Sequence, residues 1–292
     1  MSFSVQIGLL LSLATALASV LGFLYKHRGA IASPEVDMRR PLRTSLALFR
    51  NPWYTLGIAV AMGGWGFHVG ALALAPISLV QATIAGGLVM LTVVADRLFA
   101  HEVTRREWIG VALAALGLAF LAATLGETAS EAHSDYEVER LVPFLALTGG
   151  GAVVVASMAG DRLREGIMFG VSAGLFWAAS DTAIKAQSSL LGEAGAIEIL
   201  AHPLALLILL ASIAGLVVSA RSLQIGKAVP VIAMTSVAAN AATIAAGPIV
   251  FAEPLPEDTL GVVVRMAAFV LVIAAAALTP APVSAAKVVE AG

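Results

Sequence analysis

The chain contains no cysteine, and only 12% of its 292 residues are charged. The first absence excludes disulfide bonds, thiolate metal sites and a cysteine nucleophile. The second is unusual for a soluble domain, in which about a quarter of the residues are charged. The sequence also lacks a nucleotide-binding loop, a zinc-ligand helix and a nucleophile elbow. We therefore expect no hydrolase or ATPase, no cofactor and no nucleic-acid partner.

Hydrophobic residues make up 59% of the chain. They fall into separate blocks, each about as long as a helix that crosses a bilayer. A soluble all-helical protein would need polar outer faces on these helices, and the blocks have none. The sequence therefore predicts an all-α, polytopic membrane helix bundle. The nine predicted spans are about 3–25, 53–74, 77–99, 107–125, 140–159, 166–187, 203–220, 228–251 and 258–279.

Three of the loops, GETASEAHSDYEVE, GEAGAIEILAH and AEPLPED, contain no lysine or arginine. The segments that alternate with them hold 14 of the 17 basic residues. Because basic residues near span ends mark the cytoplasmic side, we expect the amino terminus outside a plasma membrane and the carboxyl terminus in the cytoplasm. The longest inside loop, 27–52, is expected to hold an interfacial helix. A tenth span that includes residues 41–50 is the alternative.

The chain also repeats itself weakly, because residues 71–126 align with 222–277 without a gap, pairing Glu102 with Glu253. The aligned spans cross the membrane in opposite directions. Such inverted repeats are typical of secondary transporters, which bind substrate near the midplane between the repeats. We expect a first membrane half at 1–126, an acidic external loop at 127–139, a second membrane half at 140–280 and a cytoplasmic tail at 281–292.

Two stretches, ALALAPISLVQATIAGGLVMLTVVADRLFAHE (71–102) and EWIGVALAALGLAFLAA (107–123), resemble the EamA-type repeat of the drug/metabolite transporter superfamily. The segment ALASVLGFLYKHRGA (16–30), the ALALAP junction and the nine-span count are similar to the NIPA-like branch. The superfamily resemblance implies export or import of small organic solutes. The NIPA-like branch implies magnesium transport.

One position departs from the NIPA-like pattern. That branch has Gly-Glu in its second span, followed three residues later by asparagine, whereas this chain has Gly64, Trp65 and His68 at those places. Magnesium prefers carboxylate oxygens or its own water shell. The missing glutamate therefore favours a small organic solute over magnesium.

The stretch FWAASDTAIKAQ (176–187) places Asp181 and Lys185 on one face of a helix. Acidic residues inside membrane spans are rare and usually face the bundle interior. Asp181 is therefore predicted to bind substrate or a coupling ion, or to form a buried ion pair. Lys185, near the outer end, is expected to extend to the interface.

Other polar groups within the spans have two interpretations each. Arg265 either pairs with Asp181 or binds an anionic group of the substrate. His68 either couples transport to protons or makes a structural hydrogen bond. The remaining groups, which line a cavity or serve helix packing, are Trp65, Trp177, Gln81 and Asn240.

Two further predictions concern packing and span ends. Gly66 and Gly70 have the spacing that lets membrane helices approach closely. Glu102 and Glu253 lie at span ends, where we expect solvated side chains, with gating as the alternative.

The combined prediction is a secondary transporter that moves a small organic solute by alternating access. Asp181 and Arg265 would form its charged core. The expected partners are a small-molecule or ion substrate and the lipid bilayer, and a homodimer stays open. The first alternative is a magnesium or other divalent-cation carrier, and the second is a non-transporting membrane scaffold or partner subunit.

Overall fold

A computed structural model describes residues 2–34, 46–86, 105–124, 130–159, 162–225 and 228–278. Within these residues the chain is helical, with no strand and one isolated bridge between Leu191 and Ala194. The all-α prediction is confirmed. The long helices are α1 (Phe3–Ile31), α3 (Pro52–Leu74), α5 (Arg105–Ala123), α6 (Val138–Ser157), α7 (Arg162–Gln187), α9 (Pro203–Ile225), α10 (Ala228–Val250) and α11 (Thr259–Leu278).

Helices occupy the predicted segments with small shifts at their ends. The largest differences are that α1 runs on to Ile31 and α9 to Ile225. The third predicted span is described from Ile77 to Gly86, and its remainder lies outside the described residues. In the 27–52 loop, residues 46–48 form one helical turn beside the undescribed segment 35–45, so neither the interfacial helix nor the tenth span is tested.

Local chemistry explains where several helices begin. The Asn51 side chain accepts a hydrogen bond from the Trp53 amide at 2.9 Å, and Pro52 occupies the first turn of α3. Such a cap satisfies one of the amides that a helix start leaves unpaired. The Asp258 carboxylate accepts from the Gly261 amide at 2.7 Å and begins α11 in the same way.

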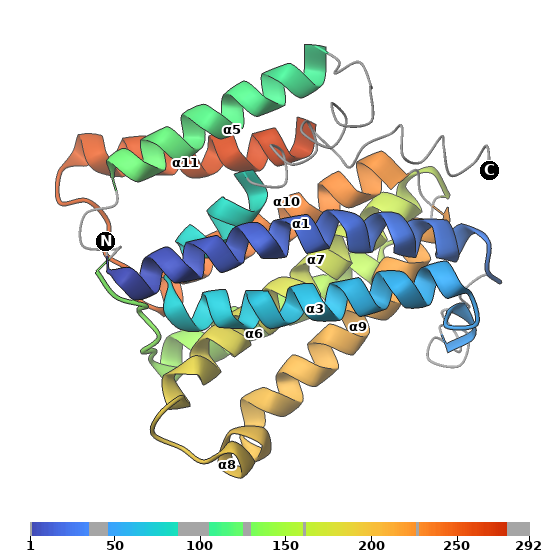
Figure 1. The fold of residues 1–292 in the computed structure, drawn as a ribbon, viewed down its shortest axis with the longest axis horizontal. Coiled ribbons are helices and arrows are strands. Elements are labelled where there is room, and N and C mark those ends of the chain that lie inside the picture. The colour runs from blue at the N-terminus through green and yellow to red at the C-terminus, as the bar shows by residue number, and fades with distance from the viewer. Residues whose placement is uncertain are drawn as a thin grey trace.

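α7 is the centre of the bundle. It packs against α6, α9 and α10, while α1 lies along α3 and α5 lies along α11 (Figure 1). In the most apolar stretch of α7, 61% of the residues are buried, against at most 39% in the other three long apolar helices. Side chains on α7 are therefore the ones best enclosed by protein.

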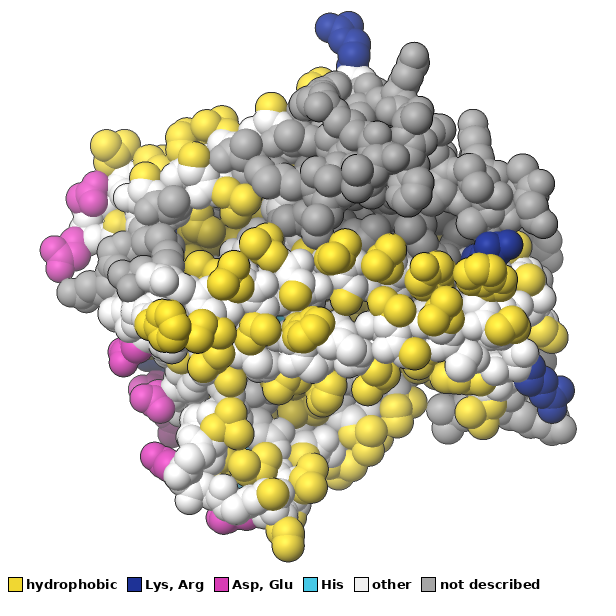
Figure 2. Space-filling view, in the orientation of Figure 1, with side chains coloured by type: hydrophobic (Ala, Val, Ile, Leu, Met, Phe, Trp, Pro, Cys, Tyr) yellow, Lys and Arg dark blue, Asp and Glu magenta, His cyan; other side chains and the backbone are white. Residues whose placement is uncertain are grey.

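The outer surface of the bundle is apolar. Four helices are long and apolar enough to cross a membrane, and further helices contain shorter apolar stretches. Large side chains such as Leu147 and Val270 are 74% and 66% exposed, and apolar side chains cover much of the face seen in Figure 2. A water-soluble monomer rarely exposes so much contiguous apolar surface. These features are compatible with a membrane protein.

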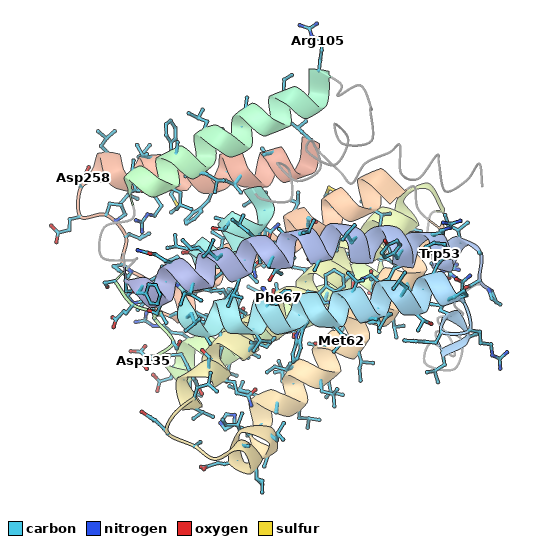
Figure 3. The ribbon with its side chains drawn as sticks, in the orientation of Figure 1. Trp53, Met62, Phe67, Arg105, Asp135 and Asp258 are labelled. Carbon is cyan, nitrogen blue, oxygen red and sulfur yellow. The ribbon has the colours of Figure 1, made fainter. Side chains whose placement is uncertain are left out.

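The two ends of the bundle differ in charge. Acidic side chains gather at one end of the face in Figure 2, and lysine and arginine lie toward the other. Figure 3 places Asp135 and Asp258 at the first end and Trp53 and Arg105 toward the second. We call these the acidic end and the basic end. At the basic end the Arg28 guanidinium lies 3.9 Å from the centre of the Trp53 ring, a favourable cation–π contact.

Glycine lets α7 and α10 touch, and this contact gives a first testable prediction. A Cβ atom on Gly174 would lie 2.4 Å from the Thr235 carbonyl oxygen, so Gly174→Ala should lower the stability of purified protein by about 1–3 kcal/mol. The control is Gly66→Ala, because a Cβ on Gly66 meets nothing within 4 Å. Unfolding curves of the two variants should separate clearly, and equal midpoints would contradict this packing. Among the described residues, no neighbour makes the close approach predicted for Gly66.

Candidate functional site

Three predicted site residues from three helices meet at one carboxylate. The His68 Nε2 atom of α3 lies 3.0 Å from Asp181 Oδ1 of α7. The Gln81 Nε2 atom, on the helix that begins at Ile77, donates to Asp181 Oδ2 at 3.1 Å. We call His68, Gln81 and Asp181 the Asp181 cluster. Each carboxylate oxygen has its own donor, which is the arrangement that a buried anion requires.

The cluster lies inside the bundle and nearer to its acidic end. Asp181 precedes the end of α7 by six residues, and His68 precedes the end of α3 by six. At 1.5 Å per residue, each is about 9 Å from its helix end. The side chains of His68 and Asp181 retain 10% and 17% of their accessible surface. The carboxylate is therefore not wholly enclosed by protein.

The second ring nitrogen of His68 has no hydrogen-bond partner in the described part of the chain, although it is buried. Because a carboxylate only accepts, Nε2 must carry the proton that faces Asp181. Nδ1 then accepts a hydrogen bond when the ring is neutral and donates one when it is charged. Buried polar atoms are rarely left unpaired, so His68 Nδ1 is the atom of the cluster most available to a ligand.

Trp177 lies one turn of α7 from Asp181, toward the basic end. The buried Lys26 ammonium of α1 lies 5.7 Å from the centre of the Trp177 ring. Gly215 of α9 leaves room for the indole, because a Cβ atom there would lie 2.5 Å from Trp177 Nε1. The side chain is half-buried. Trp177 thus borders the cluster on its basic side, and its role in binding a substrate stays a prediction.

Lys185 does not extend to the interface, and that prediction is wrong. Its side chain is fully buried. The ammonium donates to the carbonyl oxygens of Leu72 and Ala75 at 2.7 and 2.9 Å, and also to the carbonyl of Ala132. The carbonyls at the end of α3 lack partners within the helix, and they offer the buried cation a better environment than the interface.

Arg265 does not pair with Asp181, which corrects the charged core predicted from the sequence. Its Nε donates to Thr124 Oγ1 at 3.3 Å and its Nη1 to the Pro254 carbonyl at 2.9 Å. Thr124 follows the end of α5, and Pro254 lies in the loop after α10. Arg265 therefore contributes to the acidic end of the bundle, away from the partners that hold Asp181.

Glu253 is also misplaced by the sequence-based prediction, because it is 4% exposed rather than solvated. Its carboxylate accepts hydrogen bonds from the Ser78 hydroxyl and from the Ser78 amide, the latter at 3.3 Å. Its partner in the sequence repeat, Glu102, lies outside the described residues.

The remaining two predicted residues have no described contact with the cluster. Asn240 is buried on α10, and its backbone carbonyl oxygen accepts from Thr243 Oγ1 at 3.4 Å. Trp65 is 44% exposed on α3, and whether it lines a cavity stays a prediction. Whether Asn240 lines a cavity stays a prediction.

Sequence analysis missed Ser78 and Lys26 as members of polar contacts in the interior. Ser78 had a local signal, because it follows the Ala75-Pro76 break at the start of a helix, where an acidic side chain is stabilised. Lys26 was assigned to the loop after the first span, and only the longer α1 reveals that it is helical and buried.

In the part of the chain that the structure describes, no three histidine or acidic side chains are close enough together to hold a metal ion. The Asp181 cluster combines one carboxylate, one imidazole and one amide. It can accept hydrogen bonds from a polar organic group and balance a positive charge. Comparisons with family models, curated proteins and solved structures find no match to this chain.

Proposed function

We propose that this protein is a secondary transporter that moves a small organic solute across the plasma membrane by alternating access, with the Asp181 cluster as its binding site. The observation that carries the proposal is the hydrogen-bonded carboxylate itself. Asp181 belongs to the predicted second half, whereas His68 and Gln81 belong to the first. A site shared by two halves is the place where rocking motions expose a solute alternately to each side.

The helix bounds support two related halves of the kind expected for the drug/metabolite transporter superfamily. α3 begins at Pro52 and ends at Leu74, and α9 begins at Pro203 and ends at Ile225. Both bounds differ by 151 positions, which is the offset of the ungapped sequence repeat. The next helices, starting at Ile77 and Ala228, keep the same offset. Helices that share length and spacing favour an inverted repeat.

The chemistry of the cluster favours a solute that carries a hydrogen-bond donor, such as an amine or a hydroxyl group. Asp181 contributes negative charge, and neutral His68 contributes an acceptor at Nδ1. Inorganic magnesium is less well suited, because it prefers several oxygen ligands, and the cluster has only one carboxylate. The missing glutamate in the NIPA-like pattern points the same way.

A thermal-shift screen of the purified protein tests this function. The panel contains primary amines, amino alcohols, polyols and magnesium chloride, and each compound that stabilises wild type is then assayed for uptake into proteoliposomes. We expect an organic compound to raise the unfolding midpoint and to be transported, and Asp181→Asn to weaken both effects. Stabilisation and transport by magnesium alone would replace the organic solute with a divalent cation. If no compound is transported and mutations in the 27–52 loop alone disturb function in cells, the scaffold alternative holds.

A further inference from the structure

Buried charges of both signs gather at the acidic end, beyond the Asp181 cluster. Lys185 is fully buried, and Arg265 and Glu253 are 2% and 4% exposed. Lys185 and Arg265 both interact electrostatically with Glu253. The transport site proposed above uses none of them. Charged side chains are seldom buried unless they are paired, so this group needs an explanation of its own.

Each of these charged side chains lies in the predicted second half, 140–280, and contacts a residue of the predicted first half, 1–126. Lys185 of α7 binds the carbonyls of Leu72 and Ala75 at the end of α3. Arg265 of α11 binds the Thr124 hydroxyl beyond α5. These contacts tie the two predicted halves together at one end of the molecule.

Glu253 makes the third connection of this kind. It follows α10 and accepts from the amide and hydroxyl of Ser78, at the start of the Ile77–Gly86 helix. Negative charge is stabilised at a helix start, and positive charge at a helix end. Glu253 and Lys185 therefore each interact favourably with the end of a helix from the other half.

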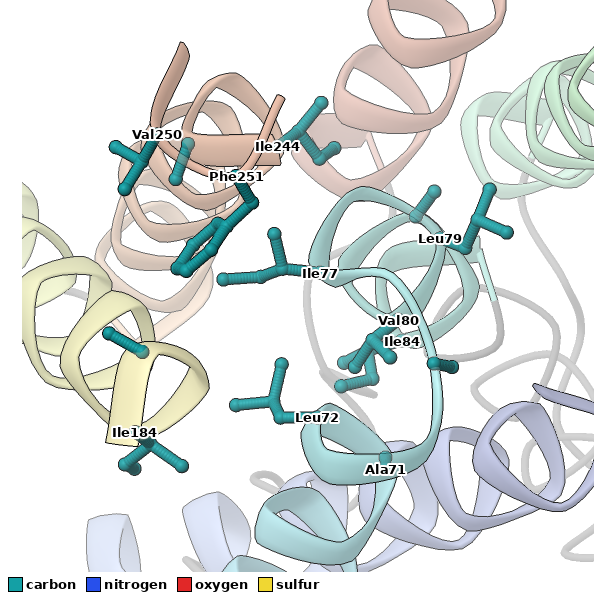
Figure 4. Packing of buried hydrophobic residues seen from close by; sticks show 14 of the residues in the cluster. Ala71, Leu72, Ile77, Leu79, Val80, Ile84, Ile184, Ile244, Val250 and Phe251 are labelled. Atoms are coloured by element: carbon teal, nitrogen blue, oxygen red, sulfur yellow. The ribbon is translucent and has the colours of Figure 1, made fainter. Parts of the chain in front are cut away.

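The contacts of Lys185 and Glu253 form a layer directly over the Asp181 cluster, and Arg265 adjoins this layer through its electrostatic interaction with Glu253. The three helices that build the cluster each contribute a group one turn nearer the acidic end: Lys185 on α7, Leu72 on α3 and Ser78 on the Ile77–Gly86 helix. Apolar side chains fill the space between them, and Figure 4 shows Ile77 facing Phe251 from the segment after α10. A solute approaching from the acidic end has to pass this layer.

We propose that Ser78, Lys185, Glu253 and Arg265 form the gate that closes the Asp181 cluster to the acidic end, which the charge distribution predicts to be the outer side. We call these residues the acidic-end gate. The proposal rests on the transport function proposed above, because a gate has meaning only if the cluster binds a solute. It assigns these residues to access, and it leaves solute recognition to the Asp181 cluster.

Charged groups suit a gate because their burial is nearly balanced. The attraction between paired buried charges is offset by the loss of their hydration. When the layer opens to water, the hydration free energy that the charges regain compensates for much of the attraction that they lose. An apolar seal would have no such compensation. Burial raises the pKa of Glu253, and the Ser78 hydrogen bonds and the charge of Lys185 oppose that shift. Loss of hydration thus disfavours the charged form of Glu253, and its interactions with Ser78 and Lys185 offset only part of that effect.

The absence of cysteine makes a direct test straightforward. In a Gln81→Cys background, the introduced thiol lies beneath the gate, at a position that is 4% exposed in the native protein. Its reaction with a charged, membrane-impermeant methanethiosulfonate is measured from each side, in vesicles of both orientations. Adding Glu253→Gln, which removes the charge and keeps the shape, should speed labelling from the acidic end about tenfold. Labelling from the basic end should not change.

The matched control is Glu257→Gln, which removes an exposed carboxylate from the same loop. If Glu253→Gln and Glu257→Gln label at the same rate, or if labelling rises from both sides, the gate is refuted. Should Glu253→Gln fail to fold, Ser78→Ala removes only one hydroxyl donor and carries the same expectation. Labelling requires no substrate, so its outcome is independent of the solute screen. If Glu253→Gln speeds labelling as expected but Asp181→Asn leaves solute binding intact, the proposed binding site is refuted and the gate is not.

Discussion

Asp181→Asn is expected to weaken binding of the transported solute about tenfold to a hundredfold. The substitution keeps the shape of the side chain but removes the charge that balances a donor group of the solute. Hydrogen bonds to charged groups contribute about 1.5–3 kcal/mol, and each 1.4 kcal/mol corresponds to a factor of ten. Titration of purified protein with the solute found in the thermal-shift screen measures this loss, and uptake into proteoliposomes should fall in parallel.

The control for that prediction is Thr182→Val, one position further along α7. Thr182 is fully buried, and its hydroxyl donates to the Ala178 carbonyl within the same helix at 2.8 Å. The variant therefore disturbs the same region without touching the Asp181 cluster, and solute affinity should stay within about twofold of wild type. Equal losses in Thr182→Val and Asp181→Asn would mean that Asp181 supports the fold and does not contact the solute.

His68 should show a different pattern from Asp181. His68→Ala removes the donor to Asp181 and also the Nδ1 atom, which has no hydrogen-bond partner among the described residues. His68→Gln can restore a donor near the position of Nε2 but cannot replace an imidazole acceptor at Nδ1. If Nδ1 contacts the solute, both variants should lose affinity about tenfold. Recovery of wild-type affinity in His68→Gln would limit His68 to orienting Asp181.

The helices could be predicted because burial in a membrane requires continuous apolar runs of fixed length. Pro52 and Pro203 mark helix starts that the structure confirms. The end of α1 could not be predicted in this way. Residues 26–30 are polar or small, and the helix continues because tertiary packing supports it. A Cβ on Gly29 would lie 2.3 Å from the Tyr54 amide nitrogen.

The part of the site that could be predicted was the polar content of the spans. Asp181, His68 and Gln81 were selected because each is polar within an apolar block, and the structure brings these three together. Their partners could not be inferred, because hydrophobic periodicity does not fix which helices are neighbours. The predicted pairing of Arg265 with Asp181 relied on charge alone. Charge does not predict the carbonyl and hydroxyl acceptors that Arg265 binds.

A signal for the acidic-end gate was nevertheless present in the charge pattern. The basic residues that do not follow the loop alternation are Arg140, Lys185 and Arg265. Arg140 is explained by an exposed pair with Glu137, and the other two are the cations of the gate. Exceptions to the positive-inside rule mark places where a cation has a protein partner in place of the cytoplasmic surface.

Lys185→Met should be among the most destabilising single substitutions in the chain. It leaves the carbonyls of Leu72 and Ala75 without their donor and Glu253 without its neighbouring charge. Removal of one partner from a buried charged group costs about 3–5 kcal/mol. Reversible unfolding of the purified protein in detergent measures the change in free energy. The double variant Lys185→Met/Glu253→Gln should recover about 1–3 kcal/mol of that loss, because it no longer buries a carboxylate beside an apolar side chain.

The same end of the molecule offers a matched pair for comparison. Arg140 Nε lies 2.8 Å from Glu137 Oε2, and the side chains are 50% and 62% exposed. Solvent screens exposed ion pairs, so a double-mutant cycle on Arg140 and Glu137 should give a coupling of about 0.5 kcal/mol or less. A cycle on Lys185 and Glu253 that gave an equally small value would show that the two charges act independently. Lys185 would then be held only by its carbonyl contacts, and Glu253 only by its contacts with Ser78. Breaking one set of contacts would leave the other set intact.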